Sequence, residues 1–430
     1  MKLLVENIRS FAGPHEFEIR PLTLLVGENS SGKSTLLAAL AAVSDPISFP
    51  NVVSLNKAPY DLGTFDTIAT YKGGRSGRAK SFSLGFRIDG DRGSTKAVEV
   101  IAAFCSDDGE ARLRSLSLKD GPVSAVLTWE KERVVVRISG LKGAGPFETL
   151  IKEETQQFST MTFQSLVSFI STSVLLEGKK FSRDTTFKMF HQLQISTRRW
   201  AGSAPRATSI SPIRSEPKRT YDRLSDEYDP SGDHIPFVLA RLLQKGSKGE
   251  ALHEALLTFG QDSGLFKGLN VKRLGTKAGD PFQVQITVGG PSVNLSDVGY
   301  GVSQSLPIIV ESILRVSGSR ILLQQPEVHL HPRAQAALGS FFSQLVSKEQ
   351  REFVIETHSD YLIDRVRQEV AEGRLPAEAV SILFFERPHI ETTVATLTLD
   401  NLGNIQNAPP SYRAFFLEEE LRLLSRGDRG

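Results

Sequence analysis

Short apolar runs separated by polar turns dominate the first third of the chain. Two of them, LLVENIRSF and HEFEIR, precede the run LTLLV, which leads into a Gly-rich loop and a helix-forming segment. Several further strand-like runs follow one another from Phe82 to Ser139, with turn residues between them. Successive short runs of this kind predict an antiparallel β layer.

The middle of the chain has a more mixed pattern. Residues 150–197 are typical of helix, and residues 198–236 are rich in Pro, Ser and Arg, which predicts a loop. Two helical segments and one strand, FQVQITV, follow. We therefore expect residues 146–289 to be a mainly helical insertion with a basic loop.

After Gly290, helices and strands alternate regularly. Val302, Leu306 and Ile309 share one face of the first of these helices, and the apolar runs between the helices predict strands. Strands that alternate with helices predict a parallel sheet with both faces covered. The fold class is therefore expected to be α/β.

Composition limits the classes of protein that this sequence fits. The net charge is +2, so overall charge favours neither nucleic acid nor an acidic partner. Cys105 is the only cysteine, which excludes an intramolecular disulfide and is typical of a reducing cytosol. The pair His329 and His331 has too few companion ligands to predict a metal site. No segment approaches the roughly 18 apolar residues that cross a bilayer, so we expect a cytoplasmic protein without membrane contact.

The sequence GENSSGKS fits the pattern G-x-x-x-x-G-K-[ST] at Gly27, Gly32, Lys33 and Ser34. It lies between a predicted strand and a predicted helix, as a phosphate-binding loop must. In such a loop the glycines let the backbone approach phosphates, the lysine reaches the terminal phosphates, and the serine ligates Mg²⁺. The motif therefore predicts nucleotide binding.

A phosphate-loop strand needs a neighbouring strand that carries an acid for Mg²⁺ and for the attacking water. Two downstream strands have polar carboxyl ends: ILLQQPE, with Gln324 and Gln325, and FVIETHS, with Glu356 and His358. A neutral imidazole at a strand end can donate a hydrogen bond to a γ-phosphate, which makes His358 a candidate sensor. A solvent-exposed histidine without such a role is the alternative.

Small and hydroxyl-bearing residues surround the start of the helix near residue 300. Ser296, Gly299, Gly301 and Ser303 would form a second phosphate-binding helix start in the same chain. An ordinary helix start with turn glycines is the alternative. One nucleotide does not need two such sites from one chain. In a symmetric dimer both sites would be used, because each copy can place this second helix start against the nucleotide held by the other copy.

Together these motifs resemble the ABC-class ATPases of the SMC, RecF and OLD kind, in the prokaryotic branch called AAA family ATPases. The opening segment IRSFAGPHEFEIRPLTLLVGENSSGKSTLL is similar to the first lobe of that branch. LSDVGYGVSQSLPII is similar to its signature motif, LLQQPEVHLHPRAQ to its Walker B and D-loop, VIETHSDYLIDRVR to its switch-histidine segment, and LTLDNLGNIQNAPPSYRAFF to its closing segment. The resemblance covers about 1–60 and 290–418.

The resemblance implies an ABC-type ATPase head with a mixed sheet, an antiparallel layer and a helical insertion. Lobe I would be residues 1–145, and lobe II would be residues 290–430. ATP and Mg²⁺ would be bound in cis by Gly27, Asn29, Gly32, Lys33, Ser34 and Thr35, and ATP in trans by Ser296, Gly299, Gly301 and Ser303. His358 would be the switch histidine. Ser34 and Gln324 stand at the metal-ligand positions, and Gln325 stands at the catalytic glutamate.

Gln324 departs from the family pattern. Gln is familiar at the second position, in the form EQPE, but an acid is expected at the first. Gln keeps the shape of Glu and removes the charge that helps to hold Mg²⁺, and loss of a positioned acid or base typically costs about 10²–10⁴-fold in rate. Three explanations are open. We favour an introduced substitution that blocks hydrolysis; the others are a naturally slow switch and a carboxylate supplied by Glu327.

The resemblance also suggests what the ATPase serves. Asp400 is isolated, so a fused nuclease domain is not predicted, and no coiled coil is present. We therefore expect a homodimer, or a higher homo-oligomer, that assembles through its ATP sites. It would act as sensor or scaffold for a separately encoded, nuclease-like effector in bacterial antiphage defence.

The alternative is a RecF-like DNA-repair ATPase. Its support is the basic stretch 198–219, which could contact DNA phosphates or could serve the fold of the insertion. Its cations are Arg198, Arg199, Arg206, Arg214, Lys218 and Arg219.

Overall fold

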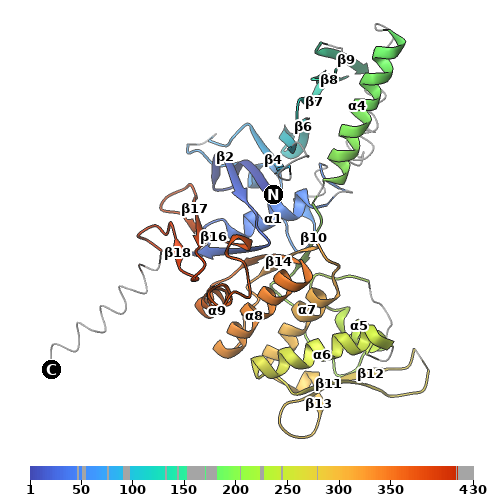
Figure 1. Cartoon of the computed structure of the whole chain (residues 1–430), viewed down its shortest axis with the longest axis vertical. Coiled ribbons are helices and arrows are strands. Elements are labelled where there is room, and N and C mark those ends of the chain that lie inside the picture. Colours follow the sequence, from blue (N-terminus) through green and yellow to red (C-terminus); the bar gives the residue numbers. More distant parts are fainter. Residues whose placement is uncertain are drawn as a thin grey trace, which may run out of the picture.

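Two large sheets and the helices packed on them make up this mixed α/β protein (Figure 1). The computed structural model describes residues 1–45, 48–50, 55–74, 77–90, 97–130, 133–142, 145–152, 170, 182–203, 205–222, 227–243, 246–277, 279–412 and 414. No described helix is long and apolar enough to span a membrane.

Eight strands of the described chain form one antiparallel sheet, in the order β2-β1-β4-β5-β6-β7-β8-β9. They are β1 (Lys2–Ile8), β2 (Phe11–Glu18), β4 (Ser81–Ile88), β5 (Val98–Asp107), β6 (Glu110–Asp120), β7 (Val123–Glu130), β8 (Arg133–Ser139) and β9 (Phe147–Lys152). In β5 and β7, buried positions alternate with partly buried ones, as in a layer with one face on the core. The antiparallel layer predicted from the sequence is confirmed, and it continues past Ser139 into β9.

The second sheet is mixed, with the order β10-β14-β15-β3-β16-β17-β18 among the described residues. Its strands are β3 (Leu22–Gly27), β10 (Ala207–Ile210), β14 (Arg320–Gln324), β15 (Glu352–Glu356), β16 (Val380–Glu386), β17 (Thr393–Leu399) and β18 (Ile405–Gln406). The first five in this order pair in parallel, and β17 and β18 are antiparallel. The predicted parallel sheet is therefore confirmed and has antiparallel strands at one edge.

The order of the strands decides which polar ends meet. β15 lies directly beside β3, and β14 is one strand further away. In the register of these strands, Gln324 is opposite Glu356, and Glu356 is opposite Leu25. The strand that adjoins the phosphate loop therefore ends in Glu356 and not in Gln324.

Both faces of the mixed sheet are buried, because successive residues of each strand point to opposite sides. Leu25 and Val354 belong to a core shared with helix α1 (Lys33–Val43) and the antiparallel layer. Leu24 and Ile355 belong to the core formed with the helices of the second half of the chain. The mixed sheet is thus a central layer, which explains why its strands are almost continuously apolar.

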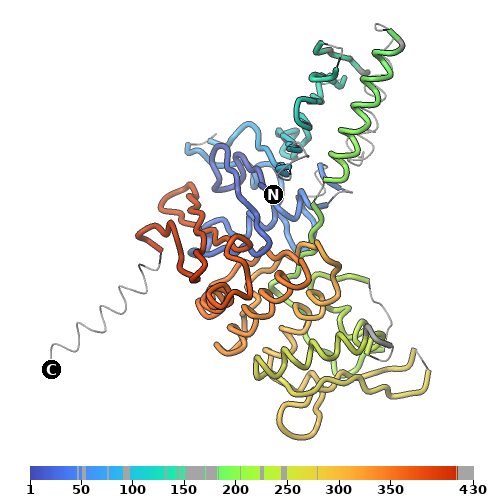
Figure 2. The backbone as a smooth tube through the Cα atoms, in the orientation of Figure 1, coloured from blue at the N-terminus to red at the C-terminus, as the bar shows by residue number. Residues whose placement is uncertain are grey.

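The remaining elements cover the mixed sheet or extend from the body (Figure 2). They are α2 (Phe65–Ile68), α4 (Arg183–Gly202), α5 (Ile235–Leu242), α6 (Gly246–Ser263), α7 (Tyr300–Leu314), α8 (Pro332–Glu349), α9 (Asp360–Ala371), the 3-10 turns at Leu295–Asp297 and Ala377–Ala379, and a small sheet of β11 (Gly268–Arg273), β12 (Phe282–Thr287) and β13 (Val293–Asn294). In Figure 1, α4 runs along β6 to β9 as an arm that projects from the body. Ser196 of α4 donates a hydrogen bond of 2.9 Å to Asp120 at the end of β6.

The middle of the chain contributes strands as well as helices. Residues 146–289 were expected to be mainly helical with one strand, FQVQITV, which is β12. The strands β9, β10 and β11 were not predicted. The four residues of β10 fall inside the stretch 198–236 that was expected to be loop, and they pair with β14 in the central sheet. Much of the helical prediction for 150–197 lies outside the described residues, apart from α4 and the residues around it.

We predict that Gly27→Ala destabilises the protein. The φ of Gly27 is 140°, and an added Cβ would lie 2.1 Å from the carbonyl oxygen of Phe385 on β16. Backbone strain of this kind costs roughly 1–3 kcal/mol, to which the steric clash adds. The midpoint of thermal unfolding should fall. Gly289→Ala is the control, since a Cβ there meets no atom within 4 Å; an equal midpoint for both variants would contradict the prediction.

Candidate nucleotide-binding site

The Gly-rich loop joins the end of β3 to the start of α1 at the edge of the central sheet. Gly32 precedes α1 with a φ of 105°, and an added Cβ would lie 3.0 Å from the ring of Phe11. Gly27 is held against β16 in the same way. The two motif glycines are therefore required by the local packing as well as by any phosphate that the loop receives.

Lys33 begins α1 and is almost completely buried. Its Nζ donates hydrogen bonds to the carbonyl oxygens of Gly27, at 2.9 Å, and Glu28, at 2.6 Å. Burial lowers the pKa of Lys33, and the negative charges of Glu356 and Glu28 oppose that effect. The ammonium group is thus held at the loop by backbone oxygens, at the place where the motif predicts contact with phosphate.

Ser34 and Glu356 meet directly, although 322 positions separate them. Ser34 Oγ donates to Glu356 Oε2 at 2.8 Å, and Gln324 Nε2 donates to the same oxygen at 3.4 Å. The backbone amide of Gln325 donates to the carbonyl oxygen of Glu356 at 2.7 Å, and Gln325 has a φ of 43°. The strand order therefore brings the carboxylate of Glu356 to the phosphate loop. The sequence analysis did not assign this residue to the site.

A cavity of about 400 Å³ opens over the loop. Ligand pockets of small molecules typically measure about 300–1,000 Å³. Its lining residues are Arg9, Ser10, Ser30, Gly32, Lys33, Ser34, Thr35, Thr67, Tyr71, Arg78, Glu356 and Arg387. Gly27 and Asn29, which were also predicted to bind ATP, do not line it, and Asn29 is exposed on the loop.

Three arginines from separate segments add positive charge to this cavity. Arg9 donates to the hydroxyl of Thr35 at 3.5 Å, and Arg387 donates to the carbonyl of Ser30 at 3.2 Å. The guanidinium of Arg78 lies 5.8 Å from the centre of the Tyr71 ring. The sequence prediction missed all three. Arg387 could have been found, because it follows β16, whose carboxyl end must lie at the same edge as that of β3.

Comparison with known families agrees with this geometry. The model of a family described as AAA domain matches residues 2–229, which is more than half of the chain. The chain belongs to this AAA domain family. A second model, described as AAA ATPase domain, matches residues 170–363. The protein is therefore a phosphate-loop ATPase of AAA type, and the predicted nucleotide is ATP.

Several solved structures are similar to this AAA-domain protein. One is an SMC head bound to the C-winged helix domain of ScpA, with 12% identity, a TM-score of 0.45, and coverage of 93% of this chain and 97% of that one. Another is an SMC head with an extended coiled coil bound to the C-terminal domain of ScpA from Pyrococcus furiosus, with 11% identity, a TM-score of 0.44 and coverage of 98% of both chains. The SMC head domain from Thermotoga maritima gives 12% identity, a TM-score of 0.39 and coverage of 92% and 97%. No curated protein matches the chain.

His358 follows β15 at the same edge of the sheet, and its side chain is exposed. Partial desolvation of the ring and the positive charge of Lys33 lower its pKa, while Glu356 acts in the opposite direction. The ring is therefore neutral at pH 7, which is the form that the sensor prediction requires.

Glu327 is the alternative source of the carboxylate missing at Gln324. Its side chain is buried, and Oε1 accepts a hydrogen bond of 2.6 Å from the backbone amide of His358. Burial raises the pKa of Glu327, and Glu327 does not line the cavity. The glutamate fixes the backbone at the sensor position, so the structure does not favour it as a metal ligand.

The predicted signature residues lie at the start of α7, away from the cavity of their own chain. None of the described residues 296–303 lines that cavity. Gly299 is exposed, and an added Cβ there would meet no atom within 4 Å. Gly301 is packed, because a Cβ there would lie 3.1 Å from the carbonyl oxygen of His329. Ser296 Oγ donates to Asn294 at 2.9 Å.

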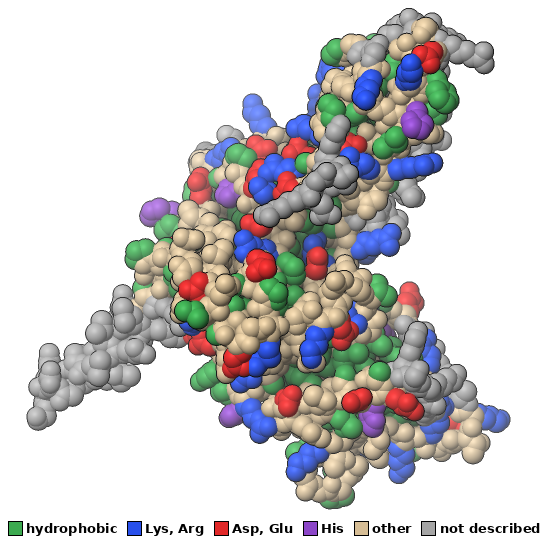
Figure 3. All heavy atoms as spheres, viewed as in Figure 1, with side chains coloured by type: hydrophobic (Ala, Val, Ile, Leu, Met, Phe, Trp, Pro, Cys, Tyr) green, Lys and Arg blue, Asp and Glu red, His purple; other side chains and the backbone are tan. Residues whose placement is uncertain are grey.

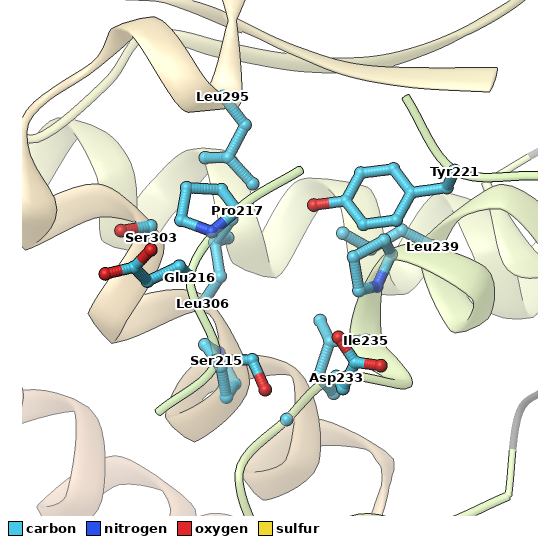
Figure 4. Close-up of a pocket in the computed structure, with 13 residues that line it drawn as sticks. Ser215, Glu216, Pro217, Tyr221, Asp233, Ile235, Leu239, Leu295, Ser303 and Leu306 are labelled. Atoms are coloured by element: carbon cyan, nitrogen blue, oxygen red, sulfur yellow. The ribbon is translucent and has the colours of Figure 1, made fainter. Parts of the chain in front are cut away.

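Ser303 faces inward instead of toward the exposed helix start. It is 6% exposed, and its hydroxyl donates to the carbonyl oxygen of Tyr300 at 3.1 Å. Figure 4 shows it near Glu216 at a small pocket that α7 forms with α5 and the segment 215–221. The pocket volume is about 30 Å³, which is room for about one water molecule. This pocket cannot receive a nucleotide.

Three of the six cations in the basic stretch 198–219 pair with acids of the same chain. Four of its cations have partners: Arg199 pairs with Asp120, Arg214 donates to the carbonyl oxygens of Gln324 and Gln325, Lys218 pairs with Asp233, and Arg219 pairs with Asp297. Burial lowers the pKa of Arg214 to about 10. Figure 3 shows positive and negative side chains interspersed on the visible face of the body. This arrangement favours a structural role for these cations over contact with DNA phosphates.

The two histidines of the strand-end loop also have structural partners. The ring of His331 accepts a hydrogen bond from the amide of Arg333 and caps α8, and the ring of His329 lies 5.7 Å from that of Tyr300. Among the described residues there is no group of three or more His, Cys, Asp or Glu arranged to hold a metal ion.

We predict that replacement of Lys33 by Met raises the pKa of His358. Removing the positive charge removes one cause of the lowered pKa, whereas Glu356→Gln should shift the pKa downward because it removes the opposing negative charge. NMR titration of the labelled histidine ring measures both shifts. Arg387→Met is the matched control, since this cavity cation does not set the pKa of His358. Unchanged titration in the Lys33 variant would contradict the placement of the ring beside the phosphate loop.

Proposed function

We propose that this AAA-domain ATPase binds MgATP at the phosphate loop, hydrolyses it slowly and dimerises around it. The observation that carries the proposal is the cavity over the loop, which combines Lys33 and three arginines with the start of α1. A helix start and several cations together favour a polyphosphate.

The residues present fit Mg²⁺ as the accompanying ion. Mg²⁺ is usually held by one or two carboxylates together with substrate phosphates and water. The hydroxyl of Ser34 and the carboxylate of Glu356 supply oxygen atoms at the loop. A site of this kind needs no cluster of three acidic or imidazole ligands, in agreement with the described residues. When bound, the ion would neutralise charge on the terminal phosphates.

Dimerisation is proposed because the start of α7 is open to a partner. Gly299 is exposed, Tyr300 is 56% exposed, and neither lines the cavity of its own chain. In a symmetric dimer, each α7 can approach the phosphates bound by the other copy. The closed interface would then form only when ATP is present, which makes the dimer a sensor of the bound nucleotide.

The cellular role that we propose rests on the resemblance of the motifs. ATPases with motifs of this kind often work beside a separately encoded effector in bacterial antiphage defence, and we assign this chain the role of sensor or scaffold for such an effector. The internal pairing of the basic stretch supports this role over DNA binding. Salt-dependent DNA binding by the isolated protein would overturn this part of the proposal.

We predict that Gly299→Glu prevents ATP-dependent dimerisation without preventing ATP binding. The backbone at Gly299 has a negative φ and open space around it, so a side chain is tolerated. A glutamate at a helix start is favourable for the helix itself, but it repels the phosphates of a partner. Light scattering after size-exclusion chromatography in MgATP should show a dimer for the wild type and for Gly299→Ser, and a monomer for Gly299→Glu. A Gly299→Glu dimer in MgATP would disprove the trans role of α7.

We predict that Gln324→Glu raises the rate of ATP hydrolysis. The new carboxylate would stand beside Glu356 and restore an acid at the end of β14. The expected gain in kcat is on the order of 10²-fold, the range for a positioned acid or base. Gln324→Ala is the control, because it removes the same hydrogen bond without adding charge. Equal kcat values for Gln324→Glu and Gln324→Ala would contradict the proposal that Gln324 slows ATP hydrolysis.

A further inference from the structure

Glu356 is the only carboxylate among the described residues that line the cavity. Lys33 and three arginines line the same space. Any ligand that these cations attract is an anion, and a lone carboxylate in contact with it is unfavourable unless a cation lies between them. The position of Glu356 therefore needs a reason other than binding of the phosphates themselves.

The contacts of Glu356 place it at the metal side of the phosphate loop. It ends β15, it is 6% exposed, and its Oε2 accepts the hydroxyl of Ser34 at 2.8 Å. The motif assigns that hydroxyl to Mg²⁺. Mg²⁺ in such sites is held by one or two carboxylates together with phosphates and water, so this carboxylate and this hydroxyl would supply two of its oxygen ligands.

We propose that Glu356, and not the residue at the end of β14, is the protein carboxylate that faces Mg²⁺ in the MgATP complex. This inference rests on the proposed binding of MgATP and names the residue that recognises its ion. Gln324 is then a positioning residue. Its amide nitrogen, 3.4 Å from Oε2, restrains the carboxylate, and an amide N–H donor does not compete for the ion.

Other carboxylates near the site do not meet these conditions. Glu327 is buried and holds the amide of His358. Glu28 lies on the exposed side of the loop and contributes its backbone oxygen to Lys33. Glu386 ends β16, the other neighbour of β3, but it does not line the cavity.

The test compares nucleotide affinity with and without Mg²⁺ in wild type and Glu356→Gln, with a fluorescent ATP analogue as the probe. In wild type, Mg²⁺ should strengthen binding. In Glu356→Gln this gain should fall on the order of ten- to a hundredfold, as for residues that support a metal ion. In EDTA the same variant should bind the analogue at least as tightly as wild type, because a negative charge beside the phosphates has been removed. The variant is thus expected to bind the analogue more weakly than wild type in Mg²⁺ but not in EDTA. Misfolding would weaken binding in both conditions, so the two explanations can be distinguished.

Two further variants make the test specific. Glu386→Gln removes a carboxylate from the end of the neighbouring strand and should keep the full response to Mg²⁺. Glu356→Asp keeps the charge with a shorter reach and should give an intermediate response. Electron paramagnetic resonance of Mn²⁺ with ATP should show protein-bound ion in wild type and much less in Glu356→Gln.

The outcomes separate this inference from the proposed function. A full Mg²⁺ response in Glu356→Gln would overturn the role of Glu356 and leave nucleotide binding at the loop intact. Binding that is unchanged in Lys33→Ala, in EDTA and in Mg²⁺, would overturn both.

Discussion

The parallel pairing of β3, β15 and β14 is the constraint on which the site depends. Parallel strands place their carboxyl ends at one edge of a sheet, and the register puts Gln324 opposite Glu356 and Glu356 opposite Leu25. The phosphate loop leaves β3 at this same edge and enters α1 at Lys33. Because both faces of the sheet are buried in apolar cores, the strands cannot slip in register without exposing those cores.

The charges at this edge complement a metal-bound polyphosphate. Lys33 is buried among backbone oxygens, and Arg9 and Arg387 are anchored to Thr35 and Ser30. Anchored cations lose little side-chain freedom when an anion arrives, so they stabilise it more than flexible ones do. Glu356 is the one negative group facing them among the described lining residues. A polyphosphate with a bound divalent cation complements both kinds of group, because its phosphates face the lysine and arginines and its cation faces Glu356.

The sequence was sufficient for what is local along the chain. The phosphate loop, the helix after it and the alternation of strands and helices follow from neighbouring residues, and the structure has each of them. It was not sufficient for contacts that depend on strand order. Glu356 was visible at a strand end, but only the placement of β15 between β3 and β14 brings it to Ser34. Strand β10 was missed because four residues between Arg206 and Pro212 carry too short a pattern.

The basic stretch shows why charge counted along a sequence is a weak guide to partners. Its cations are close together in the chain, but the acids that neutralise them come from β6, from the loop before α5 and from the segment before α7. One consequence concerns the site itself. Arg214 holds the backbone at Gln324 and Gln325, and five residues later Arg219 holds Asp297, just before α7. The short segment 214–219 therefore contacts both the end of β14 and the residues just before α7. A shift of β14 at the nucleotide site would for this reason also move the start of α7, which is proposed to meet a second copy.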